Sequence, residues 1–405
     1  MTTVDDTIIP PPAAIRATTE PGQPRFATVL QVLPELGVSG GVERGTIEIA
    51  AAISASGGRA LVASAGGAIA HELIRAGAQH IELPLASKNP FVIQANIERL
   101  AAIIRAEKVD IVHARSRAPA WSAYYAARRT GTHFVTTFHG TYSVGNPFKH
   151  RYNSVMTKGE RVIAISDFIA GHIRQIYGVP TAKIRIIHRG VDPERFDPAK
   201  VSAERVIQLA NRWNMADGMP VVMLPGRLTR WKGQTAFIDA IDKLGSRDLI
   251  CLLVGSDQGR SAYRKGLENL IEARGLGGVI RVVDNCDDMP AAYMLTDVVV
   301  SASLEPEAFG RVVTEAQAMG RPVIATDHGG SKETVLKGET GWLVPPNDAE
   351  AMAAAIDRVL KIKGPAREIL AAKGMAHVGN NFSKDAMCSK TLALYDEVLA
   401  PESAS

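Results

Sequence analysis

The sequence has few cysteines, no long apolar run and little net charge. Its 405 residues include three cysteines, Cys251, Cys286 and Cys388, which are odd in number and widely spaced. This pattern argues against a disulfide scaffold and indicates a reducing compartment, and no cysteine or histidine pair has the spacing of a structural zinc site. No window approaches eighteen uncharged apolar residues, so we expect no transmembrane helix.

The first 25 residues are rich in proline, threonine and acidic side chains. They contain no basic segment followed by a long apolar core, so we expect no signal peptide here. Their composition is typical of a disordered arm, which we predict for residues 1–25. Together these features predict a soluble cytoplasmic protein, and they leave open an association with the inner face of the cytoplasmic membrane.

The formal net charge is only +4, but it is unevenly distributed. Residues 26–200 hold 21 Lys and Arg against 13 Asp and Glu, whereas residues 201–405 hold 23 against 26. The basic excess is concentrated in residues 105–161, with ten basic and three acidic side chains. This stretch lacks a recognition motif and a set of stacking aromatics, so we expect no nucleic-acid partner.

Apolar strand-like runs alternate with helical segments, and the pattern starts twice. The first series runs from residues 26–33 to 183–187, and the second from 220–224 to 322–325. This alternation predicts an α/β protein with two Rossmann-like domains facing each other across a cleft. We expect one domain over 26–195, completed by a C-terminal helix at 384–400, and a second over 196–383. Ligands in such sheets bind at the carboxyl ends of the strands.

Two carboxylates, Glu307 and Glu315, stand eight positions apart around a turn at Phe309-Gly310 that opens a helix. Backbone N–H groups at a helix start can hold a phosphate. Glu307 could accept hydrogen bonds from sugar hydroxyls, and Glu315, about two turns later, could reach a ribose. The alternative is that each glutamate is a solvated acid at a helix end.

A second segment, GRLTRWKG at 226–233, follows a predicted strand. Arg227 and Lys232 would project from the strand's carboxyl end, where two cations would neutralise a pyrophosphate. The alternative is a surface turn with solvated bases. Upstream, the glycine-rich turn at 37–45 does not match the GxGxxG pattern, so a hydride-transfer cofactor is disfavoured. Its backbone amides could still approach a phosphate or a sugar. The alternative is a plain glycine turn that binds no ligand. His139 ends another predicted strand beside a glycine, which favours a functional role over a purely structural one.

Together these segments resemble the retaining glycosyltransferases of the GT-B architecture, above all glycosyltransferase family 4 with its glycosyl group 1 transferases. The resemblance covers residues 27 to about 398 and is carried, in order, by GGVER at 40–44, TTFHG at 136–140, RGVDPERF at 189–196, GRLTRWKG at 226–233, EAFGRVVTE at 307–315 and GGSKE at 329–333. It implies a metal-independent hexosyltransferase that uses a nucleotide-sugar donor and no cofactor.

The resemblance also implies roles for single residues. Arg227 and Lys232 would bind the donor diphosphate, Glu307 would hold donor-sugar hydroxyls, and His139 would lie near the anomeric centre. The remaining donor-binding positions are Gly41, Phe309, Gly310, Arg311, Val312, Val313 and Glu315. A double-displacement nucleophile is not evident, so front-face substitution is favoured over a glycosidase-like carboxylate pair.

Two segments depart from the family pattern, and the second bears on the identity of the nucleotide base. Arg189 stands where the family often has asparagine, and Val283 to Cys286 replace a common Phe-x-Gly, which leaves UDP and GDP both open.

Residues 110–131 are similar to bacterial transferases of lipopolysaccharide cores or surface polysaccharides. The basic stretch, with Arg115, Arg117, Lys149 and Arg151 on the acceptor side, predicts an anionic lipid-linked or saccharide acceptor, against the alternative of a solvated surface. Two other functions remain open: a sugar-nucleotide epimerase of the same fold and a catalytically silent carbohydrate-binding protein.

Overall fold

The computed structural model describes residues 16–17, 25–37, 41–142 and 145–401. The chain forms two compact units. Unit 1 comprises residues 1–165, 169–187 and 385–405, and unit 2 comprises residues 166–168 and 188–384. Most of the predicted N-terminal arm lies outside the described residues. Within its described parts, β1 (Arg16–Ala17) pairs with β2 (Arg25–Phe26) as a short antiparallel ladder.

Unit 1 is built on a seven-stranded sheet in which every neighbouring pair is parallel, with the order β5-β4-β3-β6-β7-β8-β9. Its strands are β3 (Thr28–Val32), β4 (Arg59–Ser64), β5 (Gln79–Glu82), β6 (Ile111–Ala114), β7 (His133–Phe138), β8 (Arg161–Ala164) and β9 (Ile184–Ile186). Its helices are α1 (Gly41–Ala55), α2 (Glu72–Arg75), α3 (Pro90–Glu107), α4 (Arg117–Thr130), α5 (Pro147–Asn153), α6 (Asp167–Tyr177) and α15 (Lys384–Leu399), of which α6 and α15 begin in unit 2.

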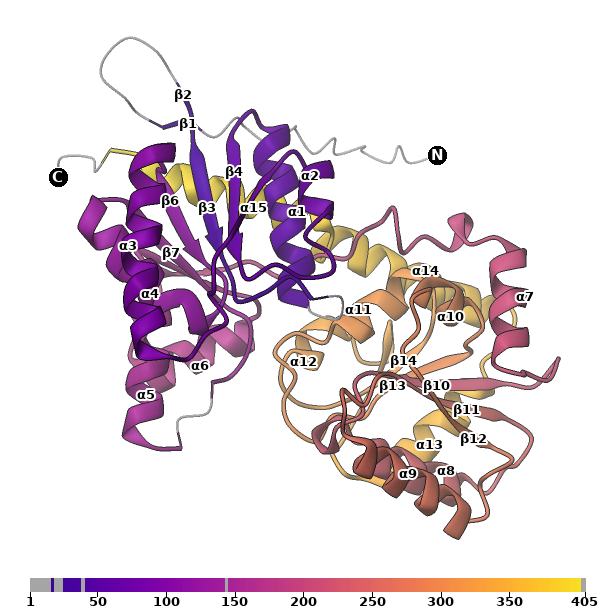
Figure 1. Cartoon of the computed structure of the whole chain (residues 1–405). Helices are drawn as coiled ribbons and strands as arrows, with labels where there is room; N and C mark the ends of the chain where they lie inside the picture. The colour runs from indigo at the N-terminus through magenta and orange to yellow at the C-terminus, as the bar shows by residue number, and fades with distance from the viewer. Residues whose placement is uncertain (1–15, 18–24, 38–40, 143–144, 402–405) are drawn as a thin grey trace, which may run out of the picture. The chain divides into compact units, whose positions relative to one another are not determined.

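The C-terminal helix α15 is part of the core of unit 1 (Figure 1). Its buried face includes Leu392, Tyr395 and Leu399, which belong to one apolar cluster with residues of β3, α1 and α2. The hydroxyl of Tyr395 and the Nδ1 atom of His113 on β6 are 2.7 Å apart, and His113 Nε2 lies 2.7 Å from the hydroxyl of Thr137 on β7. Burial lowers the pKa of His113 well below its usual value, so the ring is neutral and links the helix to two strands.

Unit 2 contains a six-stranded, all-parallel sheet with the order β12-β11-β10-β13-β14-β15. Its strands are β10 (Val221–Pro225), β11 (Ile250–Val254), β12 (Ile280–Val283), β13 (Val298–Ser301), β14 (Val323–Thr326) and β15 (Gly341–Val344). The helices are α7 (Ala203–Arg212), α8 (Gln234–Leu244), α9 (Ser261–Ala273), α10 (Met289–Met294), α11 (Arg311–Ala318), α12 (Ser331–Thr334), α13 (Ala349–Leu360) and α14 (Pro365–Asn381).

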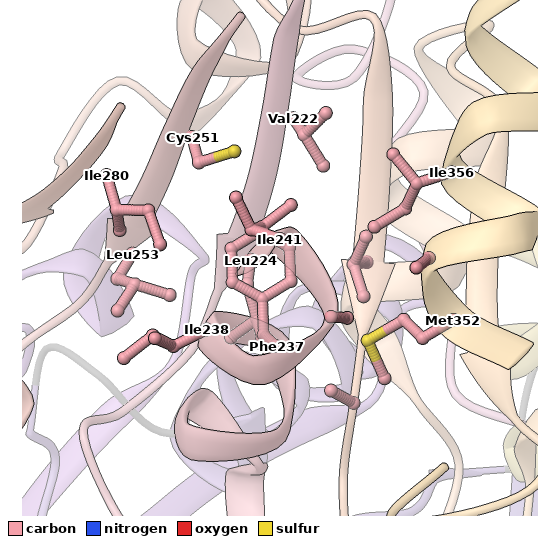
Figure 2. Packing of buried hydrophobic residues seen from close by; sticks show 14 of the residues in the cluster. Val222, Leu224, Phe237, Ile238, Ile241, Cys251, Leu253, Ile280, Met352 and Ile356 are labelled. Carbon is pink, nitrogen blue, oxygen red and sulfur yellow. The ribbon is translucent and has the colours of Figure 1, made fainter. Parts of the chain in front are cut away.

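The core of unit 2 lies between its sheet and the helices α8 and α13. Figure 2 shows Phe237 of α8 and Met352 of α13 close to Val222 and Leu224 of β10, and all four side chains are buried. Burial of one such side chain contributes about 1.5–3 kcal/mol to the free energy of unfolding. This packing holds β10 rigidly at the centre of the sheet, next to β13.

The division between the units differs from the predicted boundary at 195–196. Residues 188–196 belong to unit 2 because the chain there pairs with the end of that unit: Val191 forms a parallel bridge with Ser383, and Lys384 Nζ lies 2.9 Å from Asp192 Oδ1. No helix among the described residues is long and apolar enough to cross a membrane.

Candidate functional site

The residues singled out in the second half of the sequence meet at the carboxyl edge of the sheet of unit 2. Arg227 and Lys232 follow β10, Glu307 follows β13, and Gly329 and Gly330 follow β14. These three strands are neighbours in the sheet order, so the segments that follow them share one edge. Ligands of open parallel sheets bind at such an edge.

Lys232 and Glu307 form an ion pair at this edge. Their side chains are only 15% and 12% exposed, so the pair is largely removed from solvent. The hydroxyl of Ser303 donates a hydrogen bond of 2.6 Å to the same oxygen of Glu307, Oε1. Ser303 is itself buried, and its carbonyl accepts hydrogen bonds from Thr326 Oγ1 and His328 Nε2, both at 2.9 Å. The carboxylate is therefore held in one place by a cation and by a rigid hydroxyl.

Two close backbone approaches shape the segment around Glu307. A Cβ atom on Gly330 would lie 2.5 Å from Phe309 Cα, and one on Gly329, whose φ is +59°, would lie 2.4 Å from the carbonyl oxygen of Glu307. The amide of Gly330 donates a hydrogen bond of 2.8 Å to that carbonyl. Glycine at both positions lets the loop after β14 pack directly on the chain that carries Glu307.

Helix α11 begins at Arg311, directly after Gly310, whose φ of +92° is left-handed. The first N–H groups of a helix have no acceptor within the helix and carry its positive dipole end, so this start suits an anion. Phe309 is buried, and its ring packs edge-on against Phe382. Val313 is buried as well, whereas Val312 is half-buried.

Glu315 is nearly buried and both of its carboxylate oxygens are engaged. Arg311 Nη2 lies 2.6 Å from Oε1, and the hydroxyl of Tyr293 donates a hydrogen bond of 3.2 Å to Oε2. Burial, and then the charge of Glu315, raise the pKa of Tyr293 well above its usual value, so its hydroxyl stays a donor. If Glu315 binds a ribose, the ribose hydroxyls would replace Arg311, the more exposed of its two partners, as hydrogen-bond donors to the carboxylate.

The site residues that the sequence predicted in unit 1 lie on different elements and differ in exposure. Gly41 begins α1 and His139 follows β7, and their donor-binding and catalytic roles stay predictions. Lys149 and Arg151 are exposed on α5. Arg117 is half-buried; its Nη1 donates to Asn153 Oδ1 at 3.0 Å, and its guanidinium lies 4.2 Å from the ring centre of Tyr142.

The structure corrects the prediction that Arg115 is an acceptor-side cation, because it places this side chain in the interior. It follows β6 directly, is only 4% exposed, and lies near Glu48, Tyr395 and Cys388. Desolvation lowers its pKa from the usual value, although nearby Tyr395 and Glu48 oppose the shift. Arg115 is therefore a buried charge beneath α15 and contributes nothing to an exposed basic surface.

One group of side chains among the described residues has the composition of a metal site: Asp167, His188 and Glu333. The Glu333 carboxylate already accepts hydrogen bonds of 2.8 Å from the amides of Asp167 and Phe168, and His188 Nε2 lies 3.3 Å away. The carboxylate thus caps the first turn of α6. At the edge of the unit 2 sheet the Glu307 carboxylate is paired with the cation of Lys232, which makes it a poor ligand for a divalent metal.

Sequence reasoning missed three residues of the site: Ser303, Trp231 and Tyr293. Ser303 lies two residues after a strand that was predicted, so its place at the carboxyl edge was available from the sequence. Tyr293 and Trp231 gave no such signal, because their contacts with Glu315 and Lys232 depend on how α10 and the turn after β10 pack.

Comparison with known proteins shows the family of the chain. Residues 39–195 match the family model of Glycosyltransferase Family 4, and residues 208–376 match that of Glycosyl transferases group 1. The crystal structure of a glycosyltransferase from Rickettsia africae is 41% identical, covers 93% of this chain and 99% of its own, and has a TM-score of 0.86. The D-inositol 3-phosphate glycosyltransferase of Salinispora tropica is 29% identical over 328 residues, which are 76% of this chain and 67% of that protein.

A more distant solved structure shares the fold. Anabaena HepE in complex with UDP-glucose is 23% identical, covers 91% of this chain and 98% of its own, and has a TM-score of 0.78. With both family models matched in order and a solved relative aligned over nearly its whole length, the chain belongs to glycosyltransferase family 4 and is a glycosyltransferase built from two Rossmann-like domains.

Proposed function

We propose that this glycosyltransferase moves a hexose from a UDP- or GDP-linked donor to an anionic glycolipid or polysaccharide acceptor, with retention of the anomeric configuration. The observation that carries the donor half is the Lys232–Glu307–Ser303 cluster beside the start of α11. It offers a cation and a helix N-terminus for phosphates, and a fixed carboxylate for sugar hydroxyls. The relation to HepE, which was solved with UDP-glucose, supports a nucleotide-sugar donor.

Cleavage of the donor leaves negative charge on the departing diphosphate. Arg227, Lys232 and the N–H groups at the start of α11 would stabilise this charge, the work that a magnesium ion does in many other transferases. Glu307 would orient the sugar by accepting hydrogen bonds from its hydroxyl groups. The acceptor hydroxyl would attack the anomeric carbon from the face that the diphosphate leaves and pass its proton to a departing phosphate oxygen, so the product keeps the configuration of the donor.

The direct test is a panel of UDP-, GDP- and ADP-sugars, scored first by the shift in Tm of the purified protein and then by release of the nucleoside diphosphate. We expect one donor to raise the Tm and to be turned over slowly without acceptor, with the same rate in EDTA. NMR of the transferred sugar should show a retained anomeric configuration. An inverted product would refute the retaining mechanism, and an epimerised donor would identify an epimerase.

The acceptor half of the proposal rests on the exposed side chains of α4 and α5. Lys149 and Arg151 on α5 are accompanied by Phe148, which is 86% exposed, and by Tyr152. The indole N–H of Trp121 on α4 donates a hydrogen bond of 3.0 Å to the carbonyl of Tyr152. Basic side chains among exposed aromatics suit the interface of an anionic membrane, and the phosphorylated acceptor in the name of the Salinispora relative supports an anionic acceptor. The similarity of residues 110–131 to surface-glycan transferases points to lipopolysaccharide-core or surface-polysaccharide synthesis.

The double variant Lys149→Glu, Arg151→Glu is expected to abolish flotation with vesicles that contain 30% anionic phospholipid. Each reversed charge near an anionic surface changes binding by about 2 kcal/mol, because one attraction of about 1 kcal/mol becomes a repulsion. The charge-matched control is Lys337→Glu, Lys363→Glu, which alters two exposed lysines of unit 2 and should still float. Equal flotation of both variants, or none by the wild type at low salt, would refute the membrane-facing role of α5.

A further inference from the structure

Trp231 lies at this edge of the sheet, and the proposed function gives it no role. It lies in a single 3-10 turn, η4 (Arg230–Lys232), between the two cations of the site. The ammonium nitrogen of Lys232 lies 4.4 Å from the ring centre of Trp231, and the guanidinium carbon of Arg227 lies 5.9 Å from it. Both distances are within the range of cation–π attraction, and tryptophan is its strongest side-chain partner.

The backbone around Trp231 is fixed to the segment that carries Glu307. The amide of Leu304 donates a hydrogen bond of 2.7 Å to the carbonyl of Trp231, and the neighbouring Ser303 binds Glu307. The turn ends at Gly233, whose φ is +74°, and a Cβ atom there would lie 1.9 Å from the carbonyl oxygen of Ala302. The backbone of Trp231 is therefore held in a set position relative to the segment that carries the carboxylate and to the end of β13.

Trp231 carries no net charge, which distinguishes it from a carboxylate that could hold the same two cations together. An aspartate or glutamate in its place would neutralise Arg227 and Lys232, but its negative charge would repel the incoming diphosphate. The ring quadrupole attracts both cations without a net charge. When a diphosphate arrives, Lys232 can exchange its contact with Glu307 for one with phosphate and keep its contact with the ring, which frees Glu307 for the sugar.

We propose that Trp231 is a positioning residue that holds Arg227 and Lys232 against its indole ring, ready for the donor diphosphate. Lys232 would keep its contact with this ring while it exchanges Glu307 for a phosphate oxygen. This inference rests on the proposed function, because it presupposes that the two cations bind the diphosphate of the donor. It predicts that an aromatic ring, rather than the bulk of the side chain, is required at position 231.

The test compares three variants by isothermal titration with UDP, or with GDP if the wild type does not bind UDP. Trp231→Leu is expected to raise Kd about three- to tenfold, whereas Trp231→Phe, which keeps a weaker ring, should stay within about threefold of the wild type. The matched control is Trp342→Leu, because Trp342 on β15 also has an arginine, Arg358, at 5.9 Å from its ring centre and is not part of the site. This control should leave Kd unchanged, even where it lowers the Tm.

Tryptophan fluorescence supplies a second readout that a merely structural role would not move. Binding of the nucleoside diphosphate should change the emission of Trp231, since a charged ammonium shifts beside its ring. The change should vanish in Trp231→Phe and persist in Trp342→Phe. Equal Kd values for Trp231→Leu and Trp342→Leu, or an emission change that survives in Trp231→Phe, would overturn the inference. A wild type that binds neither nucleotide would instead overturn the proposed function itself.

Discussion

Replacing Lys232 with glutamine is expected to lower donor turnover by about a hundredfold or more. Loss of one preorganised group that stabilises developing charge typically costs this much, about 2.7–4 kcal/mol of transition-state stabilisation. The ammonium lies in a largely desolvated position, where its interaction with phosphate is stronger than at an exposed site. The same change also leaves Glu307 without its cation, so its other partner, Ser303, would remain alone to hold the carboxylate.

The reciprocal variant, Glu307→Gln, separates the two roles of the pair. It should lose turnover to a similar extent, because the amide is a weaker acceptor for sugar hydroxyls, but it keeps Lys232 for the diphosphate. We therefore expect Glu307→Gln to bind the nucleoside diphosphate at least as tightly as the wild type, and Lys232→Gln to bind it more weakly. The measurements are steady-state turnover and titration calorimetry on the same samples.

The control for Lys232→Gln is Lys265→Gln, which removes one exposed lysine from α9 and makes the same change in net charge. It should behave as the wild type in both measurements. Near-normal turnover in Lys232→Gln and Glu307→Gln would contradict the assignment of the site. A large fall in Tm would show instead that the pair is needed for folding, and the comparison would then rest on Lys232→Arg, which keeps the charge.

The second large effect concerns the C-terminal helix. Tyr395→Ala is expected to lower the free energy of unfolding of unit 1 by about 4 kcal/mol or more. Removing a fully buried aromatic ring costs about 3–5 kcal/mol, and the change also leaves the buried ring of His113 with an unmatched polar atom. Since α15 belongs to the apolar core of this unit, loss of its packing should destabilise the unit as a whole.

Urea denaturation followed by circular dichroism measures this effect. Tyr395→Phe keeps the ring and removes only the hydroxyl, so it should cost about 1 kcal/mol. Tyr125→Ala on α4 removes a tyrosine that is 42% exposed and should cost less than Tyr395→Ala by at least about 2 kcal/mol. If Tyr395→Ala were no less stable than Tyr125→Ala, the anchoring of α15 through His113 would be refuted.

Two strands that the sequence pattern did not predict, Gln79–Glu82 and Gly341–Val344, lie at sheet edges, whereas the edge strand Ile184–Ile186 was predicted. The run Val221–Pro225 is buried along its whole length and is a central strand, which its composition indicates. By contrast, Gln79–Glu82 at one edge has a single aliphatic residue, Ile81, and is only partly buried, and Gly341–Val344 begins with a glycine. Edge strands owe their structure to one neighbour, so their own sequence carries a weaker signal.

The same contrast applies to the site. The strand-end argument predicted from sequence alone that Arg227 and Lys232 lie at the carboxyl edge, because the strand before them was recognisable, whereas the pairing of Lys232 with Glu307 is known only from the structure. The basic stretch led to a wrong placement of Arg115 on the acceptor side, because the structure turns this side chain inward toward α1 and α15. The side chain's direction depends on a helix almost 280 residues away in the sequence, and no local pattern reports it.

The most direct test of the central claim is a crystal structure of the protein with the nucleotide-sugar that raises its Tm. The account predicts the diphosphate at the carboxyl edge of the unit 2 sheet, with Lys232 Nζ and Arg227 within hydrogen-bond distance of phosphate oxygens. It also predicts a sugar hydroxyl on the carboxylate of Glu307, which has released Lys232. A donor bound away from this edge, or one bound here while the Lys232–Glu307 pair stays closed, would contradict it.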